Sequence, residues 1–338
     1  MVLQHPAPPA TAAPPTPSPL TRRDVLRTTL RSPVTLRFVV TRVLAGIVAV
    51  WGAVSIVFLM IMATGNPAQV MASEEATQEE IDRIARLYGF DRPIFVQYLL
   101  FLRNLVTGEF PNSLYTDEPA FSVVLARVPA TLLLSVTGVA LGSVVGLLVG
   151  YWCATSRFRL ARVVPMKLLM VLQSTPSFLL GLLLILFFAV TWKLLPTSGM
   201  GSWKNLVMPA VTLAAYVAPA VARLFRSTIR EMEVEEHVAT ATAKGLRPRT
   251  VRRRHIAVNA LGPVIALIGM QVGGILGGAV ITEQVFAWPG VGQLLVNAVN
   301  TRDFPVALAG VILICVGFVV ASLVVDLVVA IINPRSRA

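Results

Sequence analysis

Six long apolar runs separated by polar connections organise this chain. Each is close to the length of about 20 residues that a helix needs to cross about 30 Å of hydrocarbon. The pattern therefore predicts an all-α, multi-pass membrane protein with six transmembrane helices, of which the fourth is the shortest. The six runs are 43–63, 130–153, 168–192, 206–222, 263–282 and 306–332. The first is too long for a signal-peptide core and has no clear cleavage site after it, so we expect it to stay as a membrane helix.

A polar stretch, residues 64–129, follows the first run and predicts a small extracytoplasmic domain. Its acidic residues outnumber its arginines. Apolar positions at helical spacing predict a helix over Thr77 to Leu87, which the Asp91-Arg92-Pro93 sequence ends. Phe95 to Val106 predicts a second, amphipathic helix lying along the membrane surface.

The longest interior polar segment lies between the fourth and fifth runs and predicts a helix, a sharp turn and a second helix. Acidic residues precede a run of small residues that ends at Lys244, an arrangement that suits the helix macrodipole. Gly245 is placed to end that helix in the left-handed conformation, and Pro248 is placed to begin the next one. By residue chemistry alone, this segment either contacts another protein or lies on lipid headgroups as a basic amphipathic loop.

Glycines at helical spacing predict that the membrane helices pack closely. They lie in the second and fifth runs, where small residues let helix backbones approach each other. The two sets are Gly138, Gly142, Gly146 and Gly150, and Gly269, Gly273, Gly274, Gly277 and Gly278. Pro176 and Pro219 are expected to kink the third and fourth helices.

Composition agrees with a membrane protein and gives its orientation. Of 338 residues, 55% are hydrophobic and 14% charged, and the mean hydropathy is +0.74. This leaves too little polar surface for a soluble globule. The net charge of +12 comes from lysines and arginines beside the apolar runs, which are topology signals more often than nucleic-acid contacts. Placing both termini in the cytoplasm puts most of these residues inside, so we expect no nucleic-acid partner.

Motifs for common enzymatic chemistry are absent. The sequence has no G-x-x-x-x-G-K-[ST] phosphate loop, no H-E-x-x-H metal motif and no serine, histidine and acid grouping at membrane depth. Two cysteines and three scattered histidines predict neither a disulfide framework nor a metal site. Asp326 is the one acid well inside a run, and its place near the cytoplasmic end favours an ion pair or a helix cap. The chain is therefore expected to pass a solute, without catalytic residues or a cofactor of its own.

Several separated motifs resemble those of permeases of ABC importers, in particular the first permease of the dipeptide, oligopeptide and nickel family. The polar segment carries Thr240-Ala241-Thr242-Ala243-Lys244-Gly245-Leu246, then Arg254-His255, then Asn259-Ala260-Leu261-Gly262-Pro263. Other similar stretches are Gly89-Phe90-Asp91-Arg92-Pro93, Thr175-Pro176-Ser177-Phe178, the stretch from Glu283 to Gly292, Arg302-Asp303-Phe304-Pro305 and Asn333-Pro334-Arg335. The resemblance covers nearly everything after residue 36, and it makes the lipid-headgroup reading of the polar segment the weaker one.

The resemblance implies a type I ABC importer permease in a bacterial cell membrane. Its expected partners are a homologous second permease, two cytoplasmic ATPases that bind ATP and magnesium, an extracytoplasmic substrate-binding protein and membrane lipid. Substrates expected from the family are dipeptides or oligopeptides, with a nickel chelate or glutathione as alternatives. A passive channel and an ABC exporter half are rival classes, and both are disfavoured because a channel would show a filter-like polar stripe and an exporter would lack this loop.

The resemblance also implies domain boundaries and two sets of site residues. The domains are a Pro/Ala-rich tail and basic segment (1–36), the first membrane helix (37–63), the extracytoplasmic domain (64–129), the permease core (130–332) with the coupling loop (227–262), and a cytoplasmic C-terminus (333–338). The expected ATPase-coupling residues are Thr240, Ala241, Ala243, Lys244, Gly245, Leu246 and His255. The expected outer-gate or binding-protein contacts are Asp91, Arg92, Glu283, Trp288, Pro289, Arg302 and Asp303. From the residues alone, the stretch around Trp288 reads equally well as a re-entrant loop anchored at the membrane interface.

Overall fold

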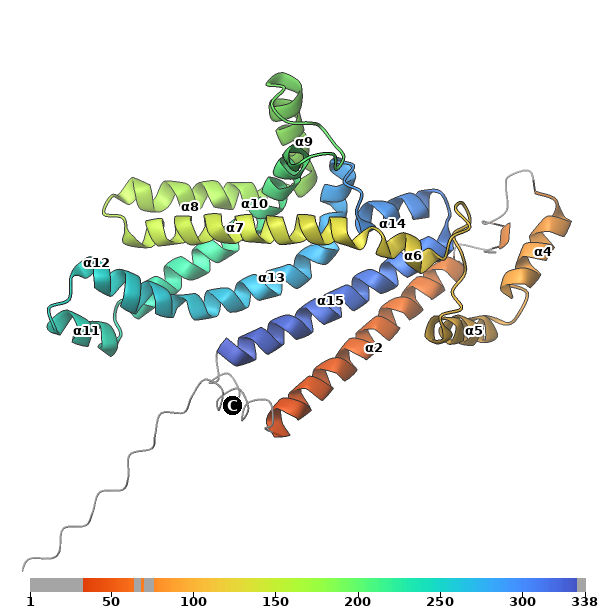
Figure 1. Ribbon diagram of the computed structural model, residues 1–338, viewed down its shortest axis with the longest axis horizontal. Helices are drawn as coiled ribbons and strands as arrows, with labels where there is room; N and C mark the ends of the chain where they lie inside the picture. The colour runs from red at the N-terminus through yellow and green to blue at the C-terminus, as the bar shows by residue number, and fades with distance from the viewer. Residues whose placement is uncertain (1–32, 64–67, 70–75, 333–338) are drawn as a thin grey trace, which may run out of the picture. The chain divides into compact units, whose positions relative to one another are not determined.

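The computed structural model describes residues 33–63, 68–69 and 76–332, so the predicted tails at both ends lie mostly outside the described residues. A first unit ends at Arg42, and its described part is the start of α2 (Pro33–Ala63). Everything below concerns the second unit, from Val43 onward (Figure 1).

The described part of this unit is helical, apart from turns and one isolated bridge between Asn112 and Pro119. After α2 its elements are α4 (Gln78–Tyr88), α5 (Ile94–Thr107), α6 (Ala120–Leu125), α7 (Val128–Thr155), α8 (Arg159–Ser174), α9 (Ser177–Leu184), the π-helical η1 (Ile185–Thr191), α10 (Trp203–Met232), α11 (Glu236–Ala243), α12 (Pro248–Thr250), the π-helical η2 (Val251–Ala257), α13 (Val258–Val285), α14 (Val291–Asn300) and α15 (Phe304–Ile332). Five helices are long and apolar enough to cross a membrane, and a sixth span results if the bent pair made by α8 and α9 with η1 counts as one. The predicted all-α, multi-pass architecture is confirmed.

The expected third and fourth helices differ from what the structure shows. The third begins earlier than predicted, at Arg159, and bends by 105° after Ser174. The fourth is not the shortest: α10 has 30 residues. Its ends carry lysine and arginine, which lower the local hydropathy, but long basic side chains reach water from a helix end without breaking the helix. α10 also continues past Pro219, where a kink was expected.

Helices α7 and α10 form the closest packed pair of the bundle. A Cβ added to Gly142 would lie 2.7 Å from Val217 Cβ, and one added to Gly146 would lie 2.7 Å from the carbonyl oxygen of Ala218. The glycine repeat in α7 therefore brings the two backbones together, as its spacing predicted. The glycines of α13 differ in how closely they are packed. A Cβ on Gly269 would overlap Val325, whereas a Cβ on Gly274 would have no atom within 4 Å.

The polar segment expected to be extracytoplasmic contains the two predicted helices. Thr77 caps α4 in a capping box with Glu80, and Gly89 ends it in the left-handed conformation at φ 73°. Helix α5 packs on the adjacent part of α2, where Tyr98 shares a 2.6 Å hydrogen bond with Ser55. Whether α5 lies along a membrane surface stays a prediction.

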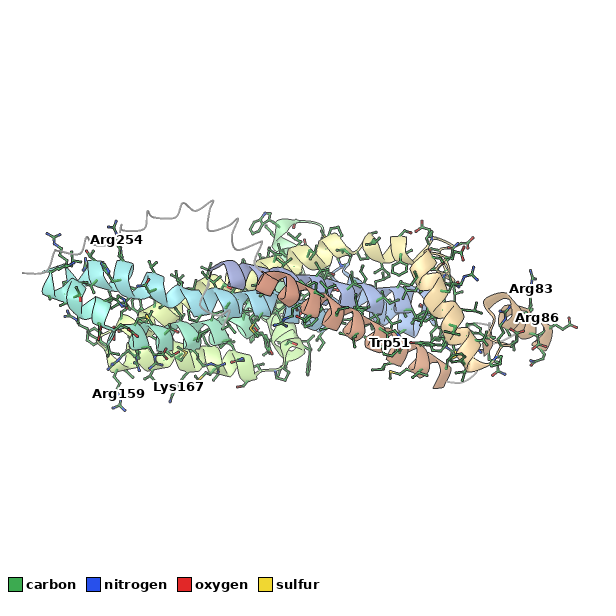
Figure 2. All side chains as sticks on the ribbon, turned by 90° about the horizontal axis from the view of Figure 1, so that it is seen from below. Trp51, Arg83, Arg86, Arg159, Lys167 and Arg254 are labelled. Carbon is green, nitrogen blue, oxygen red and sulfur yellow. The ribbon has the colours of Figure 1, made fainter. Side chains whose placement is uncertain are left out.

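Basic residues mark the two ends of this unit. Figure 2 shows Arg159, Lys167 and Arg254 at one end and Arg83 and Arg86 of α4 at the other. The positive-inside rule assigns the first end to the cytoplasm, and that orientation stays a prediction.

Candidate functional site

The polar segment between α10 and α13 has the predicted helix, turn and helix. α11 ends at a turn where Gly245 has φ 75°, and the Gly245 amide donates to the Thr242 carbonyl at 2.9 Å. Pro248 is the first residue of α12, where its missing N–H leaves no helical bond unmade. No heavy atom lies within 4 Å of the place where a Gly245 side chain would begin. Glycine is therefore favoured here by backbone conformation rather than by lack of space.

One face of α11 packs against the protein core, and the opposite face is exposed. Val238 and Ala241 are 7% and 4% exposed, and they join the core cluster that contains Val251 and Ile256 of η2. The other expected coupling residues of this segment face solvent: Thr240, Ala243, Lys244, Gly245 and Leu246. Ala241 thus supports α11 from inside, which corrects the expectation that it presents itself to another protein.

A polar cluster fixes α11 to the start of α13. The Asn259 side chain donates to the backbone carbonyl of His255 at 2.7 Å. His237 Nε2 lies 3.2 Å from the same oxygen and donates to it when that nitrogen is protonated. Among the described residues, His255 thus contributes its backbone and makes no side-chain hydrogen bond. The sequence did not single out His237 and Asn259 for this role.

At the opposite end of α13, Glu283 is the centre of a buried network. Its side chain has 0% exposure. Thr131 Oγ1 donates to Glu283 Oε1 at 2.7 Å, and the Gln293 amide donates to Oε2 at 3.0 Å. The same Thr131 hydroxyl accepts the Val291 amide at 2.8 Å. Glu283 and Thr131 thereby join α7, α13 and the first turn of α14.

Glycine makes this network possible. A Cβ on Gly290 would overlap the Glu283 carboxyl group, and one on Gly292 would lie 2.7 Å from the Val280 backbone. Trp288 is 1% exposed, and its indole N–H donates to the Ala130 carbonyl at 2.9 Å. Since a membrane-interface anchor presents its ring to lipid, this burial contradicts the reading of Trp288 as such an anchor.

A second buried acid fixes the loop before α6 to the loop between α14 and α15. Ser113 Oγ donates to Asp303 Oδ2 at 2.5 Å, and the Tyr115 hydroxyl donates to the Thr301 carbonyl at 2.5 Å. Asp303 is 5% exposed. The segment before α6 is therefore attached to the loop between α14 and α15 by hydrogen bonds between residues 186 and 190 positions apart in the sequence.

The residues expected at the outer gate or binding-protein contact differ in burial. Glu283, Trp288 and Asp303 are buried, and Pro289 is half-buried beside Trp288. Three others are exposed: Arg302, at φ 63°, and Asp91 and Arg92, on the turn between α4 and α5. Among the described residues no hydrogen bond or ion pair connects Asp91 or Arg92 to Glu283 or Asp303. Of the seven, the exposed three offer the most surface to a partner.

Comparison with known families decides what kind of protein carries these features. Residues 142–338 match the family described as the inner membrane component of binding-protein-dependent transport systems. Residues 35–135 match the N-terminal region of such membrane components. The chain belongs to this permease family.

Curated relatives agree with this assignment. The permease is 35% identical over 303 residues to the glutathione transport system permease protein GsiC of Escherichia coli (strain K12), covering 89% of this chain and 99% of that protein. It is 36% identical, with the same coverage, to GsiC of Salmonella typhi. It is thus a multi-pass inner-membrane ABC importer permease.

Solved structures share its fold. An amino acid ABC transporter, crystallised with histidines, is similar at a TM-score of 0.51 and 18% identity, covering 61% of this chain and 92% of that one. An inward-facing MetNI methionine ABC transporter is similar at 0.52 and 19%, covering 64% and 99%. These neighbours support the type I importer architecture of the permease core.

Proposed function

We propose that this permease forms, together with a sister permease, the translocation path for dipeptides or oligopeptides, driven by two separate ATPases and supplied by a substrate-binding protein. ATP and magnesium belong to the ATPases in this proposal. The observation that supports it best is the solvent-exposed face of α11 with the turn at Gly245. A short surface helix held rigidly on a membrane helix is suited to transmit the motion of a partner protein. Thr240, Ala243, Lys244, Gly245 and Leu246 form the ATPase-facing surface.

Coupling then follows from how α11 is held. Val238 and Ala241 pack on η2, and Asn259 with His237 ties α11 to the first turns of α13. A displacement of α11 by closing ATPases therefore moves η2 and α13 together. Switching by small movements of packed elements is an established route for such transmission.

Glutathione is the second candidate substrate, because the relatives with 35–36% identity are glutathione permeases. Glutathione shares carboxylate and amide groups with small peptides, so the two proposals predict the same type of path. A nickel chelate is a third family substrate without a supporting feature among the described residues. Uptake assays with the purified complex separate the three.

The first test is purification of the permease, tagged at its C-terminus, from its native membrane in mild detergent. We expect a second permease, ATPase subunits and a binding protein to co-purify, and the ligand of that binding protein identifies the substrate. Recovery of the chain alone as a homo-oligomer, under conditions that keep other transporters intact, would overturn the importer proposal and favour a channel.

The second test is Gly245→Val. A β-branched residue in the left-handed region costs about 1–2 kcal/mol, and since no atom lies near Gly245 the effect is confined to the shape of the turn. Gly108→Val is the matched control, because Gly108 ends α5 at φ 78° and also has open space. We expect Gly245→Val to insert normally and to lose ATP-driven uptake, while Gly108→Val retains it. Normal uptake by Gly245→Val would contradict the assigned role of the turn.

A further inference from the structure

The span made by α8 and α9 is broken in the middle of an apolar stretch. The two helices meet at 105°, and Figure 1 shows α9 turning away from the line of α8. Thr175 and Pro176 form the break, both with extended backbones, and Pro176 has no N–H to continue a helix. At membrane depth such irregular backbone is tolerated only where protein buries it or where it lines a water-filled cavity.

A cavity of about 230 Å³ lies at this break, between it and α10. Its polar lining consists of Gln173, Ser174, Thr175, Ser177, Thr212 and Tyr216. Three of these hydroxyls already make hydrogen bonds within the protein: Ser174, Thr175 and Thr212 each donate to the backbone carbonyl four residues earlier. The side chains of Gln173, Ser177 and Tyr216 make no hydrogen bond with any described residue, so their polar groups are open to a ligand.

Tyr216 lies near the middle of α10. It follows the start of α10 at Trp203 by thirteen residues, which is about 20 Å along a helix. Tyr216 is 58% exposed, whereas its neighbours Ala215 and Val217 are 8% and 0% exposed. An exposed tyrosine in the middle of the most buried span identifies the face of α10 that is left uncovered in this chain.

This face continues as a basic stripe. Arg223, Ser227 and Arg230 follow Tyr216 by seven, eleven and fourteen residues, a spacing that keeps them on one side of the helix. All three are exposed, and neither arginine makes an ion pair with a described residue. Arg223 lies about 10 Å along the helix from Tyr216, toward the end of α10 that connects to α11.

We propose that this cavity and stripe form a contact site for the transported solute, with Gln173, Ser177 and Tyr216 binding its amide groups and Arg223 binding its carboxylate. A glutamine side chain offers both a donor and an acceptor to a peptide unit. A guanidinium group binds a carboxylate through two parallel hydrogen bonds. The span of about 10 Å corresponds to about three extended residues, so the site fits a tripeptide-sized solute. This inference rests on the proposed function and assigns residues to its path.

The first experiment asks whether the cavity is open to water in the assembled transporter. In a background where Cys153 and Cys315 are replaced by alanine, Gln173→Cys and Tyr216→Cys are each exposed to a membrane-impermeant, positively charged thiosulfonate. Leu182→Cys is the control, since Leu182 is an exposed apolar residue of the adjoining α9. We expect the first two to be labelled faster than the control, and a tripeptide supplied with the binding protein to slow their labelling.

The second experiment tests the carboxylate contact. Uptake of a tripeptide and of its C-terminal amide is compared in proteoliposomes for Arg223→Gln and for the control Arg159→Gln, whose exposed arginine lies in the first turn of α8. Loss of a charge-assisted hydrogen bond predicts about a tenfold loss of uptake for the free peptide. Uptake of the amide is expected to stay unchanged, and so is uptake of both solutes in the control.

The outcomes separate this inference from the proposed function. A wild-type chain that does not assemble with ATPases overturns the proposed function. An assembled, ATP-hydrolysing complex in which Gln173→Cys and Tyr216→Cys react no faster than the control overturns the site alone. Labelling in the isolated chain that disappears on assembly would show that the sister permease covers this face, which also overturns it. Equal losses for peptide and amide in Arg223→Gln would overturn the carboxylate contact.

Discussion

Replacing Thr131 with valine tests whether the buried network around Glu283 holds together the end of the permease where α7, α13 and α14 meet. Valine has nearly the volume of threonine, so the substitution exchanges one hydroxyl for a methyl group. The hydroxyl donates to Glu283 Oε1 at 2.7 Å and accepts the Val291 amide at 2.8 Å. Without it, a buried carboxyl oxygen and a buried amide each lose a partner.

The size of the effect follows from these two groups. A buried polar group left without a partner costs about 1–3 kcal/mol, and more when it is charged, so Thr131→Val should lower the free energy of unfolding by about 3–5 kcal/mol. Thr131→Ser is the matched control: it keeps the hydroxyl and removes one methylene-sized group, which costs about 1 kcal/mol.

Unfolding in mixed micelles with increasing dodecyl sulfate measures both variants. The same substitution in a Glu283→Leu background should have about half its effect, because only the Val291 amide then loses a partner. If Thr131→Val is as stable as Thr131→Ser, or if its effect is the same in both backgrounds, the network does not stabilise this end of the molecule.

Two further substitutions test packing and attachment. Gly146→Ala should destabilise the bundle by about 1–3 kcal/mol because its new Cβ meets the α10 backbone. Gly52→Ala is the control and should be neutral or slightly stabilising, because no atom lies within 4 Å of its new Cβ. Thermal unfolding in detergent compares the two variants, and equal unfolding midpoints would contradict the close α7–α10 contact. Ser113→Ala removes a hydrogen-bond donor from Asp303 and should speed proteolysis of the loop before α6, whereas Ser122→Ala, at an exposed position, should not. Equal cleavage rates in the two variants would show that Ser113 does not attach the loop.

Local sequence signals predicted those parts of the permease whose structure is determined locally. The helix expected over Thr77 to Leu87 is α4, Gln78–Tyr88, because its cap and its apolar stripe both lie within one short segment. The turn at Gly245 was predicted for the same reason. Spacing of glycines in α7 predicted close packing because the helical repeat itself places them on one face.

Features set by distant residues were not predictable in this way. Thr131 is a single polar residue near the start of α7, and its partner Glu283 lies 152 residues away. Glu283 and Trp288 were expected at the outer gate from family resemblance, but nothing in their local sequence indicated burial. The break at Pro176 was expected as a kink, and only the packing of α9 against α13 and α10 turns it into a bend of 105°.

Helix α13 runs from the η2 segment at one end to the network around Glu283 at the other. It is 28 residues long, or about 42 Å, and at one end it is continuous with η2, on which α11 packs. At the other end it carries Glu283, whose hydrogen bonds fix α14 and α7. α13 continues as one helix past its interior Pro263 to Glu283, so we expect a movement of α11 to reach the network around Glu283 through this helix. The π-helical η2 lies between α11 and α13, and π-helical turns within helices occur frequently at functional sites. We therefore expect η2 to determine whether a movement of α11 is transmitted to α13 or absorbed before it.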